Sequence, residues 1–476
     1  MTDAASNDPV TSSNAQGEEG PASGMKADLE TITSLAKRRG FVFPSAEIYG
    51  GFAAAYDYGP LGVEMRRNIR DLWWRAMVQE RDDIVGVEAA IITNPQVWTA
   101  SGHVSNFTDP LVECRECQGR FRADHLEPDD QGVVRCPNCG KAGAMGEPRQ
   151  FNMMLSTIVG PVSDESGRAY LRPETAQGMF VNFENVQTTS RKRLPFGIAQ
   201  IGKSFRNEIT VKQFIFRTRE FEQMEMEFFC HPERSLEWHT YWKKERLRWH
   251  YGLGMRPEHL RLRDHTPDEL SHYSQATADI EVHYKWGWGE LEGVAHRGDY
   301  DLTQHAQHSG KRLTYLDPET NQHIVPHVVE PAVGLDRVML SLLLDAYDED
   351  EIGGEKRVVL RLAPSVAPVT VAVLPLSRKD TLEPTAQRVA SMLRKQWKVQ
   401  YDDTQSIGRR YRRQDEIGTP LCVTVDFDTL DDQAVTIRER DTTEQIRVPI
   451  TGLEAAVRER LEALQPHVPS LDEIEI

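Results

Sequence analysis

The sequence predicts an α/β protein made of two main parts and a small insertion. Three observations support this. The segment from Phe196 to Phe229 is typical of two long strands joined by a loop, strands and helices alternate after Pro368, and two Cys-x-x-Cys pairs interrupt the first part. A chain of 476 residues has room for two to four domains at about 100–200 residues each. We expect a disordered tail at 1–24, a first domain at 25–365 with an insertion at 113–148, and a C-terminal domain at 366–476.

Composition excludes several classes of protein. Hydrophobic residues make up 39% and charged residues 27%, which is typical of a globular chain. No apolar run reaches the roughly 18 residues of a membrane-spanning helix, and no apolar segment follows a basic start as in a secretory signal. We therefore expect a cytoplasmic protein without a membrane partner. The net charge of −17 argues against broad, non-specific binding of nucleic acid, although it allows a local basic surface.

The N-terminal elements follow from composition and spacing. Residues 1–24 are rich in Ser, Ala, Gly, Asn and acidic residues and lack apolar periodicity, so we expect disorder. From Leu29 the apolar residues have helical spacing, and Lys37-Arg38-Arg39 suits the negative end of a helix dipole. Gly50–Pro60 is rich in glycine and aromatic residues and is expected to be a loop, followed by a helix over Gly62–Val78.

The insertion carries the clearest local motif. Cys114 and Cys117 form one Cys-x-x-Cys pair, and Cys136 and Cys139 form the second. Two such tight turns can supply four thiolates in a tetrahedron, which is the arrangement of a structural Zn²⁺ site. Such a metal would stabilise a segment too small for its own core. The alternative is that these cysteines are unmetallated or form a redox pair.

The centre of the chain contains a pair of strands with charged ends. We expect strands over Ile198–Phe205 and Thr218–Phe229, and in the second Phe221, Gln223, Glu225 and Glu227 share one face. Apart from Phe221 that face is polar, so it is expected to line a site. The arginines around the connecting loop are suited to phosphate, and a ladder of structural ion pairs is the alternative. Residues 233–275 have a helical pattern.

A strand-to-helix corner follows. Val325–Glu330 is expected to be a strand, Pro331–Gly334 a turn, and Leu335–Ala346 an apolar helix. This would bring the carboxylate of Glu330 near the guanidinium of Arg337, at a position where ligands are often bound. The alternative is an ordinary helix start in which Asp336 favours the dipole.

The C-terminal part alternates between strands and helices, which indicates a compact α/β domain of about 100 residues. The expected elements are strand Val369–Leu374, helix Glu383–Gln396, strand Trp397–Tyr401, helix Arg409–Ile417, strand Leu421–Val425 and strand Ala434–Arg438.

Taken together, these segments resemble the three signature motifs of class II aminoacyl-tRNA synthetases. The glycine-aromatic loop and helix around Pro60 resemble motif 1, Phe205–Glu208 with the following strand resembles motif 2, and Gly334-Leu335-Asp336-Arg337 resembles motif 3. Within the class, the chain is similar to the homodimeric glycyl-tRNA synthetases. The similar stretches are Lys37-Arg38-Arg39-Gly40-Phe41, Glu47-Ile48-Tyr49-Gly50-Gly51, Tyr56–Gly62, Ser101-Gly102-His103, Leu171–Gly178, Gly202–Glu208 and Arg219-Glu220-Phe221.

The resemblance implies a fold and a reaction. The fold is a catalytic domain built on an antiparallel sheet flanked by helices, with a zinc-knuckle insertion and a C-terminal mixed α/β anticodon-binding domain. The reaction activates glycine with ATP to glycyl-adenylate and transfers it to the 3′ end of tRNA(Gly), releasing AMP and pyrophosphate. Two alternatives remain. The chain could be a class II synthetase for serine, threonine or proline, which the glutamates and Arg172–Gly178 disfavour, or a non-catalytic paralogue, which Arg206, Glu208 and Arg337 disfavour.

The resemblance also implies how ATP binds. Arg206 would hold the α-phosphate and its developing charge, and Arg337 the γ-phosphate, so these two residues are the expected catalytic groups. Phe221 would stack on adenine with Glu208 accepting from its amino group, and Glu290 would lie near ATP and Mg²⁺. The full set implied for ATP is Arg206, Asn207, Glu208, Phe216, Arg217, Thr218, Phe221, Glu290, Leu291, Gly334, Asp336 and Arg337.

Glycine offers only an ammonium and a carboxylate for recognition, so its pocket should hold several acids and little space. The resemblance places Glu174, Glu225 and Glu330 around the ammonium and Arg122 on the carboxylate. The full set implied for glycine is Arg122, Glu174, Phe221, Gln223, Glu225, Glu330 and Gly334. One departure stands out, because Ala332 occupies a position where the family commonly has serine.

The tRNA partner requires a basic surface on an acidic chain. The best candidate is the run Arg409, Arg410, Tyr411, Arg412 and Arg413, with Arg191-Lys192-Arg193 second. In the first run Tyr411 could stack on an unpaired base. The alternative for either run is a solvated helix face. The resemblance further implies a homodimer.

Overall fold

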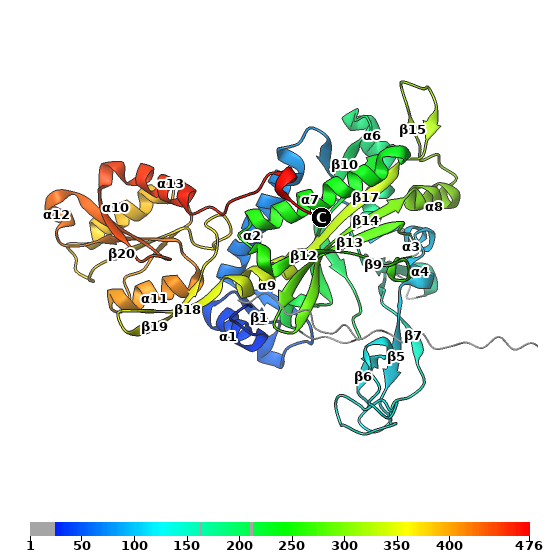
Figure 1. Cartoon of the computed structure of the whole chain (residues 1–476), viewed down its shortest axis with the longest axis horizontal. Helices are drawn as coiled ribbons and strands as arrows, with labels where there is room; N and C mark the ends of the chain where they lie inside the picture. Colours follow the sequence, from blue (N-terminus) through cyan, green and yellow to red (C-terminus); the bar gives the residue numbers. More distant parts are fainter. Residues whose placement is uncertain (1–23, 162–163, 210–212, 272) are drawn as a thin grey trace, which may run out of the picture.

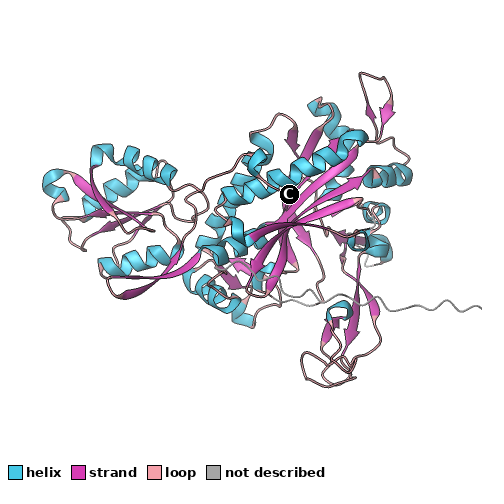
Figure 2. Cartoon of the chain, in the orientation of Figure 1, coloured by secondary structure: helices cyan, strands magenta, loops and turns pink. Residues whose placement is uncertain are grey.

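The computed structural model describes residues 24–161, 164–209, 213–271 and 273–476, so the tail expected at 1–24 lies outside the described residues except for Gly24. The described chain forms a large body around a long twisted sheet, a smaller body at the C-terminal side, and a projecting insertion (Figure 1). Figure 2 shows that strands lie at the centre of both bodies and that helices lie around them.

The large body is organised by a sheet with the strand order β12-β13-β14-β17-β11-β10-β3, counted over the described residues. Every neighbouring pair is antiparallel except β10 and β3, which run parallel. The expected antiparallel sheet is therefore confirmed. Its strands are β3 (Ile84–Gly86), β10 (Phe196–Phe205), β11 (Glu220–Cys230), β12 (Leu260–Asp264), β13 (Ala276–Tyr284), β14 (Gly287–Gly298) and β17 (His327–Gly334).

The two faces of this sheet differ in character. On β11, Met224, Met226 and Phe228 are buried in the main apolar core, together with Trp242 of the long helix α7. Helix α7 lies along this face in Figure 1. Because side chains alternate along a strand, Gln223, Glu225 and Glu227 project to the other face. The helices of this body are α1 (Leu29–Arg39), α2 (Pro60–Trp74), α3 (Pro95–Ala100), α4 (His103–Asn106), α5 (Ala176–Phe180), α6 (Phe183–Ser190), α7 (Ser235–Gly252), α8 (Tyr300–Ser309) and α9 (Leu335–Ala346).

Several expected elements agree with the structure and others are wrong. The helix expected at Leu335–Ala346 is confirmed by α9, and a π-helical turn extends α2 to Gln79. Gly50–Pro60 is only partly a loop, because β2 (Tyr56–Tyr58) pairs with β1 (Val42–Pro44). The helical pattern of 233–275 ends at Gly252, and Leu260–Asp264 is strand β12.

The expected turn at Pro331–Gly334 is also wrong, because β17 continues through Gly334. Proline has no N–H to donate to a ladder, and the pairing of β17 with β11 is interrupted at this point. It resumes on either side, with Glu225 opposite Ala332 and Phe228 opposite Val329. The strand therefore accommodates Pro331 at a gap in its hydrogen-bond ladder and leads directly into α9.

The insertion and the short sheets lie around the main sheet. In the insertion β5 pairs with both β6 and β7 (Figure 1). The remaining strands of the large body form small sheets or hairpins. They are β4 (Ile92–Thr93), β5 (Thr108–Glu113), β6 (Arg120–Arg122), β7 (Arg149–Asn152), β8 (Leu155–Ile158), β9 (Arg168–Leu171), β15 (Tyr315–Leu316), β16 (His323–Ile324), β18 (Tyr347–Ile352) and β19 (Glu355–Leu360).

The C-terminal body is a mixed sheet with the order β21-β20-β22-β23-β24, covered by helices. Its first three strands in that order are parallel, and β23 and β24 are antiparallel to their neighbours, which confirms the mixed α/β domain that the resemblance implies. The elements are β20 (Val371–Pro375), α10 (Glu383–Leu393), β21 (Val399–Tyr401), α11 (Ile407–Ile417), β22 (Leu421–Val425), α12 (Thr429–Asp432), β23 (Ala434–Glu439), β24 (Gln445–Pro449) and α13 (Leu453–Ala463).

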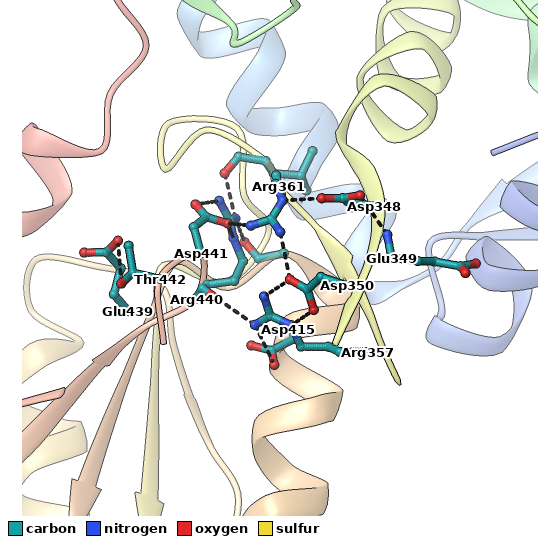
Figure 3. Close-up of polar contacts among 12 residues, drawn as sticks. Asp348, Glu349, Asp350, Arg357, Arg361, Asp415, Glu439, Arg440, Asp441 and Thr442 are labelled. Atoms are coloured by element: carbon teal, nitrogen blue, oxygen red, sulfur yellow. Dashed lines mark hydrogen bonds and ion pairs between the residues drawn. The ribbon is translucent and has the colours of Figure 1, made fainter. Parts of the chain in front are cut away.

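A charged cluster joins the two bodies (Figure 3). Arg357 of the β18–β19 hairpin donates to Asp350 and lies 3.3 Å from the buried Asp415 of α11. Arg361 contacts Asp348 and Asp350 within the large body and reaches Asp441 at 2.9 Å in the small one. The cluster contains four arginines and four aspartates, namely Arg357, Arg361, Arg438, Arg440, Asp348, Asp350, Asp415 and Asp441.

The end of the chain returns to the large body. After α13 the chain crosses back toward α7 (Figure 1), and Ile474 is buried in the main apolar core. Searching the described residues for a helix with the length and apolar character to cross a membrane finds none.

Candidate active site

A cavity of about 290 Å³ lies on the polar face of the main sheet. Strands β11, β14 and β17 form its floor, and the loop between β10 and β11 forms one wall. Most of the expected site residues line it. These are Glu174, Arg206, Glu208, Phe216, Arg217, Thr218, Phe221, Gln223, Glu225, Glu290, Leu291, Glu330, Gly334, Asp336 and Arg337.

Arg206 is held at the end of β10 by its backbone and by aromatic rings. Its N–H donates to the carbonyl of Arg219, and its Nε donates to the carbonyl of Pro173 at 3.1 Å. Its guanidinium lies between the rings of Phe107 and Phe221, about 5.5 and 5.3 Å from their centroids. Within the described residues its two terminal nitrogens, Nη1 and Nη2, make no hydrogen bond, which leaves them available to a bound phosphate.

Arg337 begins α9 at the opposite wall. Its Nε donates to the carbonyl of Phe216 at 3.2 Å, and its Nη1 lies 3.3 Å from a carboxylate oxygen of Glu290. The guanidinium covers the ring of Phe216 rather than that of Phe221, with 4.6 Å to the centroid. The positive charge of Arg337 lowers the pKa of Glu290, so that carboxylate is ionised at neutral pH.

Glu208 and Asp336 have different surroundings. Burial raises the pKa of Glu208, while Arg217, 3.9 Å away, opposes that rise. The carboxylate of Asp336 accepts from Arg66 and Tyr58 and from the backbone N–H of Glu222. Asp336 therefore ties α2 and β11 to the start of α9 and fixes the corner that carries Arg337.

Three buried glutamates converge at the inner end of the cavity. Glu174 lies 3.2 Å from His103 and accepts from Gln177 at 2.9 Å. Burial opposes ionisation of Glu174, but its contacts with His103, Arg297 and Gln177 outweigh burial and lower its pKa. Glu225 accepts from the N–H of Thr175 at 3.0 Å. Burial and the charges of the other glutamates raise the pKa of Glu225 to about 8 and that of Glu330 to about 6. The cluster therefore favours a cation that would relieve this repulsion.

Arg297 and Asp301 form a buried ion pair next to the glutamates, and sequence reasoning did not identify it. Arg297 of β14 is buried, donates to Glu330 at 2.5 Å and makes two bonds of 2.8 Å to Asp301 of α8. In the sequence Arg297 and Asp301 are four residues apart, like many surface ion pairs, and nothing in the sequence marks them as part of a site. The main sheet places them under Glu330.

Further lining residues come from β13 and the segment before it. His265 Nε2 lies 2.7 Å from the carboxylate of Asp279, which faces Gly293 across the sheet. Burial, with the charge of Glu290, raises the pKa of Asp279 to about 6. Sequence reasoning missed this group because it assigned no strands to Ala276–Gly298. The added lining residues are His265, Ser271, Tyr273, Thr277 and Asp279.

Two expected residues stand apart from the cavity lining. Asn207 follows Arg206, and its N–H donates to the carbonyl of Met153. Arg122 lies on β6 of the insertion, 3.0 Å from Asp109 and 2.6 Å from Asp124. The charge of Arg122 acts on Glu208, so its guanidinium lies within electrostatic reach of the cavity.

The four cysteine sulfurs of the insertion meet in one cluster, each within 4.8 Å of the others. Cys114 and Cys139 are 3.8 Å apart, and Cys117 and Cys136 are 3.6 Å apart. Zinc bound to four thiolates at about 2.3 Å places the sulfurs about 3.8 Å from one another. The donor set and its spacing therefore fit that metal.

The basic run of the C-terminal body divides into exposed and buried members. Arg410 is 1% exposed and donates to the carbonyls of Pro375 at 2.5 Å and Leu376 at 3.2 Å, so it holds the domain together. Tyr411 donates or accepts a 2.6 Å bond with Thr424. A surface groove beside the β18–β19 hairpin is nevertheless lined by Arg409, Tyr411, Arg412 and Arg438. Arg413 instead pairs with Asp402 at 2.5 Å.

Comparison with family models gives two matches. Residues 159–347 match the tRNA synthetase class II core domain (G, H, P, S and T), and residues 370–460 match the anticodon binding domain. The first match contains β10, β11, β17 and most of the cavity lining.

Several curated proteins are similar over nearly the whole chain. Glycine–tRNA ligases of Thermobifida fusca and Streptomyces coelicolor are each 57% identical, over 91% and 92% of this chain and 98% and 99% of the relatives. That of Caldanaerobacter subterraneus is 54% identical over 92% of this chain. Among solved structures, a prolyl-tRNA synthetase of Cryptosporidium parvum complexed with L-proline and AMP has a TM-score of 0.63 at 15% identity, covering 93% of this chain and 80% of that chain.

Proposed function

The chain belongs to the glycine–tRNA ligase family of class II synthetases and catalyses ATP-dependent joining of glycine to tRNA(Gly), and from this we propose how its residues divide the reaction. One observation carries the proposal. A single cavity is lined both by Arg206 and Arg337 and by the buried glutamates 174, 225 and 330.

ATP would occupy the part of the cavity between the two arginines. Arg206 would hold the α-phosphate as the glycine carboxylate attacks it, and Arg337 would hold the γ-phosphate of the leaving pyrophosphate. Phe221 offers its ring to adenine and Glu208 accepts from the adenine amino group. The reaction needs no general base, because the attacking carboxylate is already ionised. Correct placement and charge stabilisation supply most of the acceleration.

Magnesium fits the carboxylates at the mouth of the cavity. Mg²⁺ prefers oxygen ligands, and Glu290 and Asp279 are close enough for the charge of one to raise the pKa of the other. When bound, the metal would neutralise phosphate charge. Arg337 then keeps Glu290 oriented, since the two groups are paired at 3.3 Å.

The glycine ammonium would be held by Glu174, Glu225 and Glu330, with Gln223 and Gly334 closing the pocket. The acids are buried, so a cation bound among them interacts strongly in a poorly solvated site. We propose that Ala332 and Gly334, which both line the cavity, limit the space beside the glycine Cα. Arg122 remains our proposal for the substrate carboxylate, which would require it to leave Asp109 or Asp124.

We assign tRNA binding to the C-terminal domain, residues 366–476, and in particular to Arg409, Tyr411 and Arg412. These residues line the groove beside the β18–β19 hairpin. Arg409 is exposed and its guanidinium can reach phosphate, whereas Arg410 serves the fold. Catalysis we assign to residues 25–365.

We also propose that the insertion at 113–148 holds a structural Zn²⁺ through Cys114, Cys117, Cys136 and Cys139. The cluster has little apolar core of its own, so the metal would supply much of its folding free energy. Metal analysis of the purified chain should find about one zinc per chain, and none in the C114S/C136S variant. A wild-type chain that lacks zinc yet keeps a protease-resistant insertion would contradict the assignment.

A homodimer is supported by an exposed apolar segment. Ile48, Tyr49 and Phe52 are 87%, 86% and 65% exposed, and they lie between β1 and β2 in the motif 1 region. An apolar patch of this kind is typical of an interface. The segment also contacts Arg219, which lies over the ring of Phe52 and donates its backbone N–H to the carbonyl of Ala54, while the carbonyl of Arg219 accepts from the N–H of Arg206.

Pyrophosphate exchange with glycine, alanine and serine tests the assignment of this cavity. We expect exchange with glycine alone, and its loss in R206A, which leaves the glutamates in place. The D403N variant, which alters the exposed Arg378–Asp403 pair of the C-terminal domain, is the matched control. Exchange by R206A at the rate of D403N would show that the nucleotide binds elsewhere.

A further inference from the structure

A fourth glutamate lies beneath the proposed glycine pocket and has no role in the reaction as described so far. Glu227 on β11 is 0% exposed, and one of its carboxylate oxygens lies within 4.8 Å of one oxygen each of Glu225 and Glu330. The pairing of β11 with β17 on both sides of the gap at Pro331 places Glu227 directly opposite Glu330. Two carboxylates therefore face each other across adjacent strands in a buried position.

The other glutamates have partners that stabilise their negative charge. Glu174 has His103 and Gln177, Glu225 accepts from Thr175, and Glu330 accepts from Arg297. Within the described residues, no N–H or O–H donor is paired with either carboxylate oxygen of Glu227. An unpartnered ionised carboxylate is far more costly to bury than a protonated one.

The charges around Glu227 cannot supply the missing partner. The groups that face it are Glu225 on its own strand, Glu330 on β17, Arg297 on β14 and Asp301 on α8. Arg297 is the cation nearest in this set, and its bonds go to Asp301 and Glu330. Burial, followed by the charge of Glu330, raises the pKa of Glu227 well above its ordinary value.

We propose that Glu227 is a positioning residue of the glycine pocket, which stays protonated and donates its acid O–H to the carboxylate of Glu330. Glu330 is then held from two sides, by Arg297 and by Glu227, with an oxygen lone pair directed at the substrate ammonium. A proton shared between close carboxylates is the usual solution where two charges cannot both be accommodated. This inference rests on the glycine pocket proposed above.

Two variants of similar size test the role of the proton. In E227Q the amide N–H replaces the acid O–H as donor, whereas E227L has the bulk and no donor. We expect the KM for glycine in exchange to stay within about threefold in E227Q and to rise at least about tenfold in E227L, with the KM for ATP unchanged in both. An E227Q enzyme as impaired as E227L would overturn the proposal, because Glu227 would then act as an anion, for example toward a bound cation.

Stability and infrared spectra test protonation without relying on activity. Because E227Q has nothing to ionise, its Tm should equal or exceed that of the wild type at pH 7.5, and the difference should widen toward pH 9. The glycine-saturated wild type should show the carbonyl stretch of a carboxylic acid that E227Q lacks. A lower Tm for E227Q at pH 7.5, or an unchanged spectrum, would contradict the proposal.

The E330Q variant separates this inference from the pocket assignment. If the pocket is wrong, neither E330Q nor E227L changes the KM for glycine. If only the role of Glu227 is wrong, E330Q raises that KM while E227Q and E227L behave alike.

Discussion

Single residues of the cavity act through charge that the fold brings together. Glu174, Glu225 and Glu330 come from three separate segments, and burial makes their mutual repulsion strong. Such a cluster opposes folding stability and favours a bound cation. A substrate whose distinguishing feature is an ammonium on an unsubstituted carbon suits this arrangement.

The acids predict a pH dependence for substrate binding. With the pKa of Glu330 at about 6 and that of Glu225 at about 8 in the free enzyme, both carboxyls lose protons as the pH rises from 6 to 8. Their ionised forms attract the ammonium, so the KM for glycine should fall several-fold over this range while the KM for ATP stays constant. Exchange assays across the range measure both constants. A KM for glycine that is flat or rises would contradict the assigned pKa directions.

Ala332 offers a second test at this scale. Its Cα lies opposite Glu225 on β11 and Gly293 on β14, so a serine hydroxyl there would reach the pocket. We expect A332S to change the KM for glycine by no more than about threefold and to leave kcat nearly unchanged, because one neutral hydrogen bond has a small net effect. A drop in kcat beyond about tenfold would show that Ala332 is misplaced.

At the scale of elements, a helix or strand could be predicted from the sequence when interactions between residues close in sequence determine it. The helix at Leu335–Ala346 and the strands of the C-terminal domain were predictable because apolar periodicity decides them. The turn at Pro331 was wrong because proline is usually excluded from central strands, and only the neighbouring strand shows the ladder gap that accepts it. The acids of motifs 2 and 3 could be identified by resemblance, whereas Arg297, Asp279 and Glu227 acquire their surroundings from strand pairing.

The basic helix α11 gives a prediction that separates binding from folding. R409A should weaken tRNA charging and leave glycine-dependent exchange unchanged, because Arg409 is exposed in a domain remote from the cavity. R410A should instead lower the Tm, because its guanidinium bonds to buried carbonyls. Charging, exchange and thermal unfolding of the two variants decide this. Equal loss of charging and exchange in R409A would indicate a defect in folding.

At the scale of the whole molecule, the two domains are held by ion pairs as well as by apolar contacts. Asp415 is fully buried and accepts from Arg438 at 2.9 Å within its domain and from Arg357 at 3.3 Å across the junction. The cluster balances four arginines with four aspartates, and Figure 3 labels all of these residues except Arg438. Its removal should therefore affect the relation between the domains more than the catalytic cavity.

The substitution D415N tests this role. Loss of the charge leaves the buried Arg438 without its carboxylate partner and leaves Arg357 with Asp350 alone. Breaking a buried pair in this way typically costs about 3–5 kcal/mol. We expect a lower Tm and reduced charging with exchange preserved, and little effect from D403N at the exposed Arg378–Asp403 pair. If D415N charges tRNA as well as D403N does, the junction does not set domain placement.

The burial of Ile474 against the large body has a practical meaning for anyone handling this enzyme. The anticodon-binding domain is attached to the large body at both ends, because Val366 and Ala367 before it and Ile474 after it are buried in the main apolar core. A purification tag fused after Ile476 would strain the buried contact of Ile474, whereas an N-terminal tag would leave that contact in place.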